Sequence, residues 1–205
     1  MGHGFGMPHS SGMYGQTYDN VWDVMSAVGA FCSPDPVFGC LGKHTISYHK
    51  NLVGWISPGQ KYSPSAFTQT ITLEHLALPE TSNYLMAQIP IADSTTHFYT
   101  VEARHPTGYD NKLPGPAVII HEVDTTRADT RAQIVDVDAN GDTGDAGAMW
   151  TVGEVFSDQA NNISVAVDSA TASGFVVTIA FRPTPRQLRP TNDSAWLVGN
   201  RHYRE

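Results

Sequence analysis

ISVAV at positions 163–167 and FVVTIAF at positions 175–181 decide the fold class of this chain. In the first run, Ile163, Val165 and Val167 share one face, and the second run repeats the same alternation. A period of two is the pattern of a strand with one buried face. Two such rows indicate sheets that are packed face to face.

Five further runs rich in β-branched and aromatic residues lie upstream of these two, each bounded by turn residues. They cover residues 68–73, 84–91, 98–104, 117–123 and 134–137. We therefore expect a mainly β protein, with an antiparallel β-sandwich over residues 61–182. Residues 183–205, which are rich in proline and arginine, are interpreted as a solvated tail or linker.

Composition limits the classes of partner. The chain has 205 residues, of which 40% are hydrophobic, so it can bury a sizeable core. Twelve basic residues against twenty acidic ones give a net charge of −8, which argues against nucleic acid or an anionic membrane surface as the main partner. No run of about 18 apolar residues is present, so we expect no membrane span.

Residues 1–60 are less regular and are interpreted as loops that build a site, with short helical turns possible only in 20–30 and 44–56. Cys32 and Cys40 flank a short segment that a disulfide can close, which would favour an oxidising compartment. The alternative is a pair of reduced, buried cysteines.

Two histidines stand near the start of the chain, in His3-Gly-Phe-Gly-Met-Pro-His9. At about 100° per residue, an uninterrupted helix would place them on different faces. Gly6 can end a helix with a left-handed φ, and Pro8 cannot continue it, so the chain can turn and bring His9 back beneath His3. A frayed terminus is the alternative interpretation of such a Gly- and His-rich start.

Met25 follows His9 by sixteen residues, within the segment YDNVWDVMS at 18–26. This segment resembles the methionine turn of metzincin zinc peptidases, and residues 3–9 match the second half of their motif HExxHxxGxxH. His9-Ser10 resembles the gametolysin group, and residues 98–124 resemble the β domain of immune inhibitor A-like peptidases. The resemblance implies a secreted endopeptidase that acts on proteins or peptides, with residues 1–60 as the end of its catalytic domain.

The same resemblance implies that His3 and His9 bind Zn²⁺ and that Met25 lies under the metal. The first histidine and the general-base glutamate of the motif would fall on the two positions before Met1. We therefore assign no catalytic base within the chain and expect this polypeptide to be inactive as given. Ala27 stands where some metzincins place a tyrosine ligand, which argues against a tyrosine switch.

A second cation site is suggested by DVDANGD at 136–142, which is similar to the first half of a calcium loop. Its candidate Ca²⁺ ligands are Asp136, Asp138, Asn140 and Asp142. Gly147 occupies the position where such a loop carries a bidentate glutamate, and Asn140-Gly141 is also typical of an ordinary turn.

Two rival functions remain open. A non-catalytic β-sandwich could bind a protein or a glycan, with residues 1–60 as a remnant without a metal role. A folded protein with structural zinc alone is the third interpretation.

Overall fold

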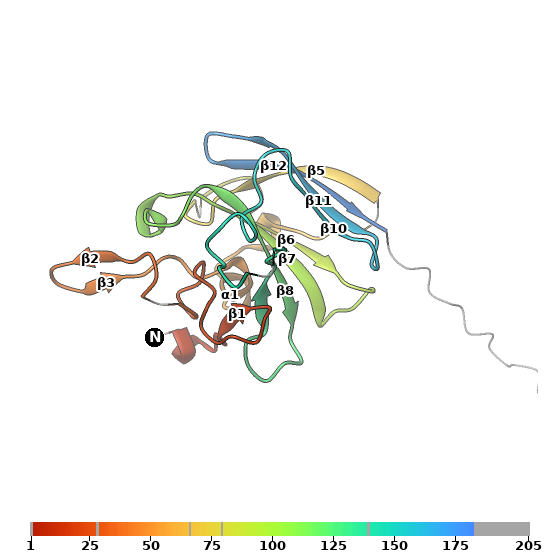
Figure 1. Cartoon of the computed structure of the whole chain (residues 1–205). Helices are drawn as coiled ribbons and strands as arrows, with labels where there is room; N and C mark the ends of the chain where they lie inside the picture. Colours follow the sequence, from red (N-terminus) through yellow and green to blue (C-terminus); the bar gives the residue numbers. More distant parts are fainter. Residues whose placement is uncertain (1, 28, 66, 79, 139, 183–205) are drawn as a thin grey trace, which may run out of the picture.

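The computed structural model describes residues 2–27, 29–65, 67–78, 80–138 and 140–182, so the interpretation of 183–205 as a tail lies outside the described residues. The chain is mainly β, as expected, with two larger sheets and one small hairpin (Figure 1). Among the described residues, no helix has the length and apolar character that crossing a bilayer requires.

The two runs that decide the fold class pair with each other in a four-stranded antiparallel sheet. Its strands, in order across the sheet, are β10 (Val155–Asp158), β11 (Ile163–Ala170), β12 (Gly174–Phe181) and β5 (Phe67–Glu74). Val165 lies opposite Ile179, and both side chains are buried. Strand β10 was not predicted, because Val155 and Ser157 are exposed and the run lacks an apolar row.

The second sheet has six strands. In order they are β1 (Ser10–Gly12), β9 (Ala132–Ile134), β8 (Ala117–Asp124), β7 (His97–Arg104), β6 (Met86–Pro90) and β4 (Lys61–Tyr62). The four central strands are antiparallel, but the edge strands β1 and β4 run parallel to their neighbours. No tight hairpin links either edge strand to its partner, so chain connectivity does not impose an antiparallel direction.

Side chains from both sheets share one hydrophobic cluster. The four-stranded sheet contributes residues such as Ile71, Val165 and Val177, and the six-stranded sheet contributes residues such as Val101 and Ile120. Figure 1 shows β5, β11 and β12 lying over β6, β7 and β8. The largest hydrophobic cluster among the described residues is therefore built from both sheets.

The first sixty residues contain little regular structure. They form the 3₁₀ turn η1 (Gly2–Phe5), the hairpin strands β2 (Ser33–Asp35) and β3 (Gly39–Leu41), the helix α1 (Ser47–Leu52) and the 3₁₀ turn η2 (Pro58–Gln60); η3 (Gly108–Asp110) follows β7. Helix α1 confirms the helical turn expected within 44–56. Residues 20–27 form hydrogen-bonded turns instead, because their polar side chains bind nearby backbone amides.

A buried arginine joins this N-terminal segment to the six-stranded sheet. Arg104, at the end of β7, is fully buried and binds the carboxylates of Glu102 and Asp110. It also donates to the carbonyl oxygens of Trp22 (2.8 Å) and His44 (3.2 Å). Residues 1–60 and the sheet that follows them therefore share one ionic network.

Candidate functional site

The chain turns at Gly6, where the sequence predicts the end of a short helix. Gly6 has a φ of +81° and donates its amide to the His3 carbonyl, while the Met7 amide donates to the Gly2 carbonyl. This pair of bonds is the Schellman arrangement that closes a helical turn with a left-handed residue. The turn directs Pro8 and His9 back towards His3.

His3 and His9 lie side by side as a result, with ring centroids 4.5 Å apart and ring planes nearly perpendicular. His3 Nδ1 donates to the Met7 carbonyl oxygen over 3.0 Å, since that oxygen can only accept. His9 Nδ1 lies 3.0 Å from the Asp129 carboxylate, in the connection between β8 and β9. In both rings the neutral form that donates from Nδ1 keeps the lone pair of Nε2 available, which suits a metal ligand.

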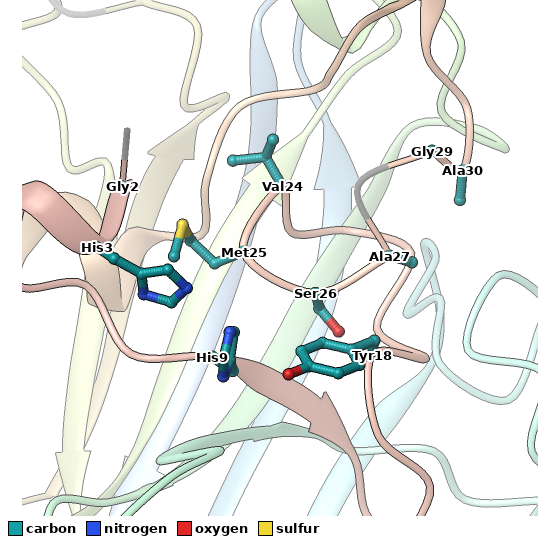
Figure 2. Close-up of a pocket in the computed structure, with 10 residues that line it drawn as sticks. All are labelled: Gly2, His3, His9, Tyr18, Val24, Met25, Ser26, Ala27, Gly29 and Ala30. Atoms are coloured by element: carbon teal, nitrogen blue, oxygen red, sulfur yellow. The ribbon is translucent and has the colours of Figure 1, made fainter.

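Met25 lies directly beside the two histidines (Figure 2). A Cβ at Gly2 would collide with the Met25 sulfur, so the absence of a side chain at position 2 is what allows this approach. The Asp23 carboxylate accepts the Met25 amide over 3.1 Å, and the Asp23 carbonyl accepts the Ser26 amide. The methionine is thus held at the top of a tight, hydrogen-bonded turn.

A fully buried polar network holds this turn in place. Asp23 accepts hydrogen bonds from Ser10 Oγ (2.6 Å) and Thr45 Oγ1 (2.8 Å), and it lies 3.1 Å from His49 Nδ1. Burial raises the pKa of the Asp23 carboxyl, but attraction to His49 and these hydrogen bonds outweigh it and hold the pKa well below its ordinary value. Asp23 is therefore ionised wherever the protein is folded at neutral pH.

An open cavity of about 610 Å³ is lined by His3, His9, Tyr18, Met25 and the small residues Ala27, Gly29 and Ala30. The Tyr18 ring lies 4.8 Å from the His9 ring, edge to face, and Figure 2 shows its hydroxyl on the side of His9. Tyr18 has a φ of +61°, an unfavourable conformation for a bulky residue. None of the described residues that line this cavity carries a carboxylate.

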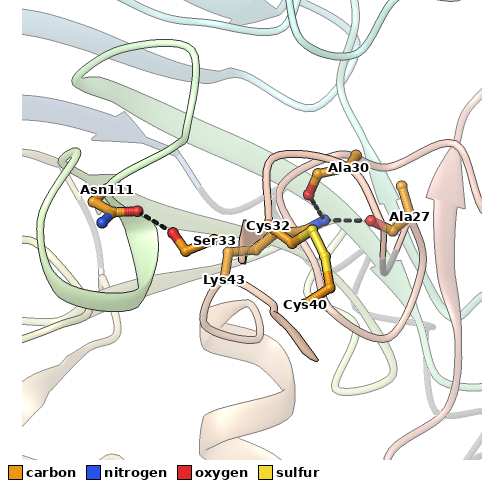
Figure 3. The surroundings of a disulfide bond; sticks show 7 residues. All are labelled: Ala27, Ala30, Cys32, Ser33, Cys40, Lys43 and Asn111. Carbon is orange, nitrogen blue, oxygen red and sulfur yellow. Dashed lines mark hydrogen bonds between the residues drawn. A yellow bond between two sulfur atoms is a disulfide. The ribbon is translucent and has the colours of Figure 1, made fainter. Parts of the chain in front are cut away.

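A disulfide between Cys32 and Cys40, with Cα atoms 5.5 Å apart, closes the hairpin of β2 and β3 next to this cavity. Figure 3 shows the Lys43 ammonium near the disulfide, joined by hydrogen bonds to Ala27 and Ala30, which line the cavity. Lys43 donates to the carbonyl oxygens of Ala27 and Ala30, and burial lowers its pKa to about 8. The hairpin and Lys43 together fix the rim.

The acidic residues predicted from the calcium-like pattern form a second cluster. Carboxylate oxygens of Asp136, Asp138 and Asp145 lie within 4.8 Å of one another. Asp142 lies outside this group and accepts the Gly144 amide, while the Asn140 amide nitrogen donates to Asp138 and Asp145. The structure therefore places Asp145, and not the predicted Asp142, beside Asp136 and Asp138, because the chain turns at Asp142–Asp145 and the Asn140 side chain bonds Asp145.

Three residues at these sites carry no signal that could be recognised in the sequence. Asp129 is 120 residues from His9, and Tyr18 reaches the cavity only through its left-handed backbone. Asp145 lies off the alternating spacing of a calcium loop. By contrast, the spacing of His3, Gly6 and His9 does predict that the two histidines approach each other, and the family resemblance implies that Met25 lies beside them.

A comparison with known protein families, with curated proteins and with solved structures finds no match to this chain.

Proposed function

We propose that this chain supplies two zinc ligands, His3 and His9, to the catalytic site of a secreted zinc endopeptidase of the metzincin kind. One observation carries the proposal: the two imidazoles lie 4.5 Å apart beside Met25, each with Nδ1 hydrogen-bonded to an acceptor. That arrangement orients the rings and leaves both Nε2 lone pairs for a metal. An apolar, polarisable methionine beside them agrees with the family resemblance.

The chemistry of such a site divides between the metal and the chain. A bound zinc would polarise the scissile carbonyl and lower the pKa of its water. This chain would hold the metal through two imidazoles and shape the cavity rim through Lys43 and the hairpin. Tyr18, beside His9, is placed to contact a peptide in the cavity. The described residues that line the cavity include no carboxylate and no histidine besides His3 and His9, so the general base and a third histidine ligand would come from outside this lining.

We also infer that the two sheets with their shared core, apart from the edge strand β1, are the expected β-sandwich of residues 61–182, and that residues 1–60 end a catalytic domain. The common hydrophobic cluster supports the first inference. The Cys32–Cys40 disulfide supports secretion, since disulfides persist in oxidising compartments.

Zinc titration of the purified chain tests the proposal, with excess Ca²⁺ present to saturate acidic sites. We expect binding of one Zn²⁺, weakened about tenfold or more by either His3→Ala or His9→Ala. His105→Ala is the control, because His105 contacts His75 and not the cavity. Unchanged affinity in both test variants would reject the zinc site.

Activity provides the second test. The chain alone should not hydrolyse a protein substrate. A longer polypeptide with a catalytic domain and His-Glu before Met1 should show chelator-sensitive proteolysis that His9→Ala removes. Proteolysis that survives this substitution would contradict the role given to His9.

A second candidate function is non-catalytic binding, and one observation favours it. A cavity of about 590 Å³ is bordered by Trp55 and Tyr109, whose exposed fractions are 54% and 57%. Exposed aromatic rings beside a cavity suit a protein or glycan partner. Zinc binding that survives both histidine substitutions would favour this function over the peptidase.

A further inference from the structure

The loop of residues 136–147, here the acidic loop, holds a buried carboxylate without a partner. Asp136 is 2% exposed, and neither of its carboxylate oxygens has a hydrogen-bond partner among the described residues. A buried, unpaired carboxylate is costly, so such groups are usually paired or bound to a metal. Asp136 faces Asp138, which makes the cost larger and raises its pKa, with burial as the leading cause.

Gly147 allows this carboxylate and that of Asp138 to lie close against the loop backbone. A Cβ at Gly147 would lie 2.5 Å from Asp136 Oδ1 and 2.7 Å from Asp138 Oδ1. Only glycine therefore permits the two carboxylates to face the loop interior. The Asn140 amide holds Asp138 and Asp145 towards the same point, with donor–acceptor distances of 3.0 Å and 2.6 Å. Three carboxylates thus lie close together, and among the described residues no basic side chain contacts them.

We propose that the acidic loop binds one Ca²⁺ through Asp136, Asp138 and Asp145. Three carboxylates that lie close together suit Ca²⁺, which accepts six to eight oxygen ligands in variable geometry. Mg²⁺ demands a near-ideal octahedron and keeps several waters, so the loop should prefer Ca²⁺. Asp142 takes no part, since its carboxylate caps the Gly144 amide.

The position of the loop gives this cation a structural consequence. The Tyr14 hydroxyl donates to the Asp136 carbonyl, and the Trp22 indole donates to the Thr143 carbonyl over 2.6 Å. Thr143 Oγ1 also bonds the Asp19 carbonyl and the Val21 amide. The acidic loop therefore holds the segment that precedes the turn at Met25 in place. Bound Ca²⁺ stabilises this segment and, through it, the Met25 side of the cavity lined by His3 and His9.

Thermal unfolding of chelator-stripped protein, with and without Ca²⁺, tests this site. We expect Ca²⁺ to raise Tm in a concentration-dependent way, as a ligand of the folded state must. Mg²⁺ at the same concentration should do less. Tb³⁺ titration offers an independent readout, since Tyr14 and Trp22 adjoin the loop and can sensitise its luminescence.

Matched substitutions of aspartates in the acidic loop distinguish a specific Ca²⁺ site from nonspecific attraction of cations to acidic side chains. Asp145→Asn should weaken Ca²⁺ binding about tenfold or more, whereas Asp142→Asn should leave it within about twofold. Asp136→Asn should remove the Ca²⁺ effect while leaving the metal-free protein at least as stable, because a buried unpaired charge is lost.

His9→Ala should bind Ca²⁺ normally, so the result is independent of the zinc proposal. No Ca²⁺ effect on Tm, or equal losses in Asp142→Asn and Asp145→Asn, would overturn the inference.

Discussion

At the scale of single residues, the contact between His9 and Asp129 has the most direct consequence for function. Asp129 is exposed to solvent, with 59% of its side chain accessible, yet its carboxylate meets His9 Nδ1 over 3.0 Å. This hydrogen bond lowers the pKa of Asp129 and fixes the orientation of the imidazole through its Nδ1. A carboxylate in this position fixes the tautomer of a metal-binding histidine and makes its other nitrogen more basic.

We therefore predict that Asp129→Ala weakens Zn²⁺ binding to the chain about tenfold, the lower end of the effect of such outer partners. Thermal stability should change little, because Asp129 is exposed. Asp124→Asn is the control, since Asp124 caps Thr126 in the same connection without touching His9. Equal Zn²⁺ affinities of Asp129→Ala and the unmodified chain would show that Asp129 does not position His9.

At the scale of elements, β8 is buried on both faces. Val118 and Ile120 face the core between the sheets, whereas Ala117 and Ile119 meet Trp22 of the N-terminal segment. His121 lies on this second side, fully buried, and its Nε2 accepts the Asn20 amide over 2.9 Å. Burial lowers the pKa of His121 to about 4, so the ring is neutral in the folded protein at pH 7.

This predicts a loss of stability on acidification. Between pH 6.5 and about 4, the unfolded chain binds a proton at His121 that the folded chain does not, so the free energy of unfolding falls as pH falls. The shift corresponds to about 3 kcal/mol from this residue across that window. Urea unfolding at pH 7.5 and pH 4 measures it.

His121→Gln should reduce this pH dependence by a similar amount. His44 remains in that variant. Burial and Lys50 lower the pKa of His44 to about 4, so His44 also makes the free energy of unfolding depend on pH between 6.5 and about 4. An unchanged pH dependence in His121→Gln would mean that His121 is not the titrating group.

At the scale of the whole molecule, Arg104 is one of the buried contacts that join residues 1–60 to the sheets. Its guanidinium joins Glu102 and Asp110 to the carbonyl oxygens of Trp22 and His44, with no exposed surface. Removing one partner of a buried ionic network leaves the others without compensation. Removing Arg104 therefore destabilises both residues 1–60 and the six-stranded sheet.

Arg104→Met should lower the free energy of unfolding by about 3 to 5 kcal/mol, in a transition that remains single for all probes. Urea unfolding followed by Trp fluorescence and far-UV circular dichroism tests both points. Arg127→Met, which breaks a half-exposed ion pair with Glu122, should cost less than about 1 kcal/mol. Separate transitions in the unmodified chain would show that the N-terminal segment is an independent unit.

The sequence by itself determined the mainly β class, most strand positions and the approach of His9 to His3, because all of these follow from local rules. Strand alternation has a period of two, and Gly6 followed by Pro8 ends a helical turn. These patterns depend only on neighbours along the chain.

Tertiary structure alone decided which distant groups complete the sites. It brought Asp129 to His9, Tyr18 to the cavity and Asp145 to Asp136, and it ran the edge strands β1 and β4 parallel to their neighbours. The physical reason is common to all of these. The entropic cost of closing a flexible loop rises only slowly with its length, so sequence separation carries little information about which loop residues meet.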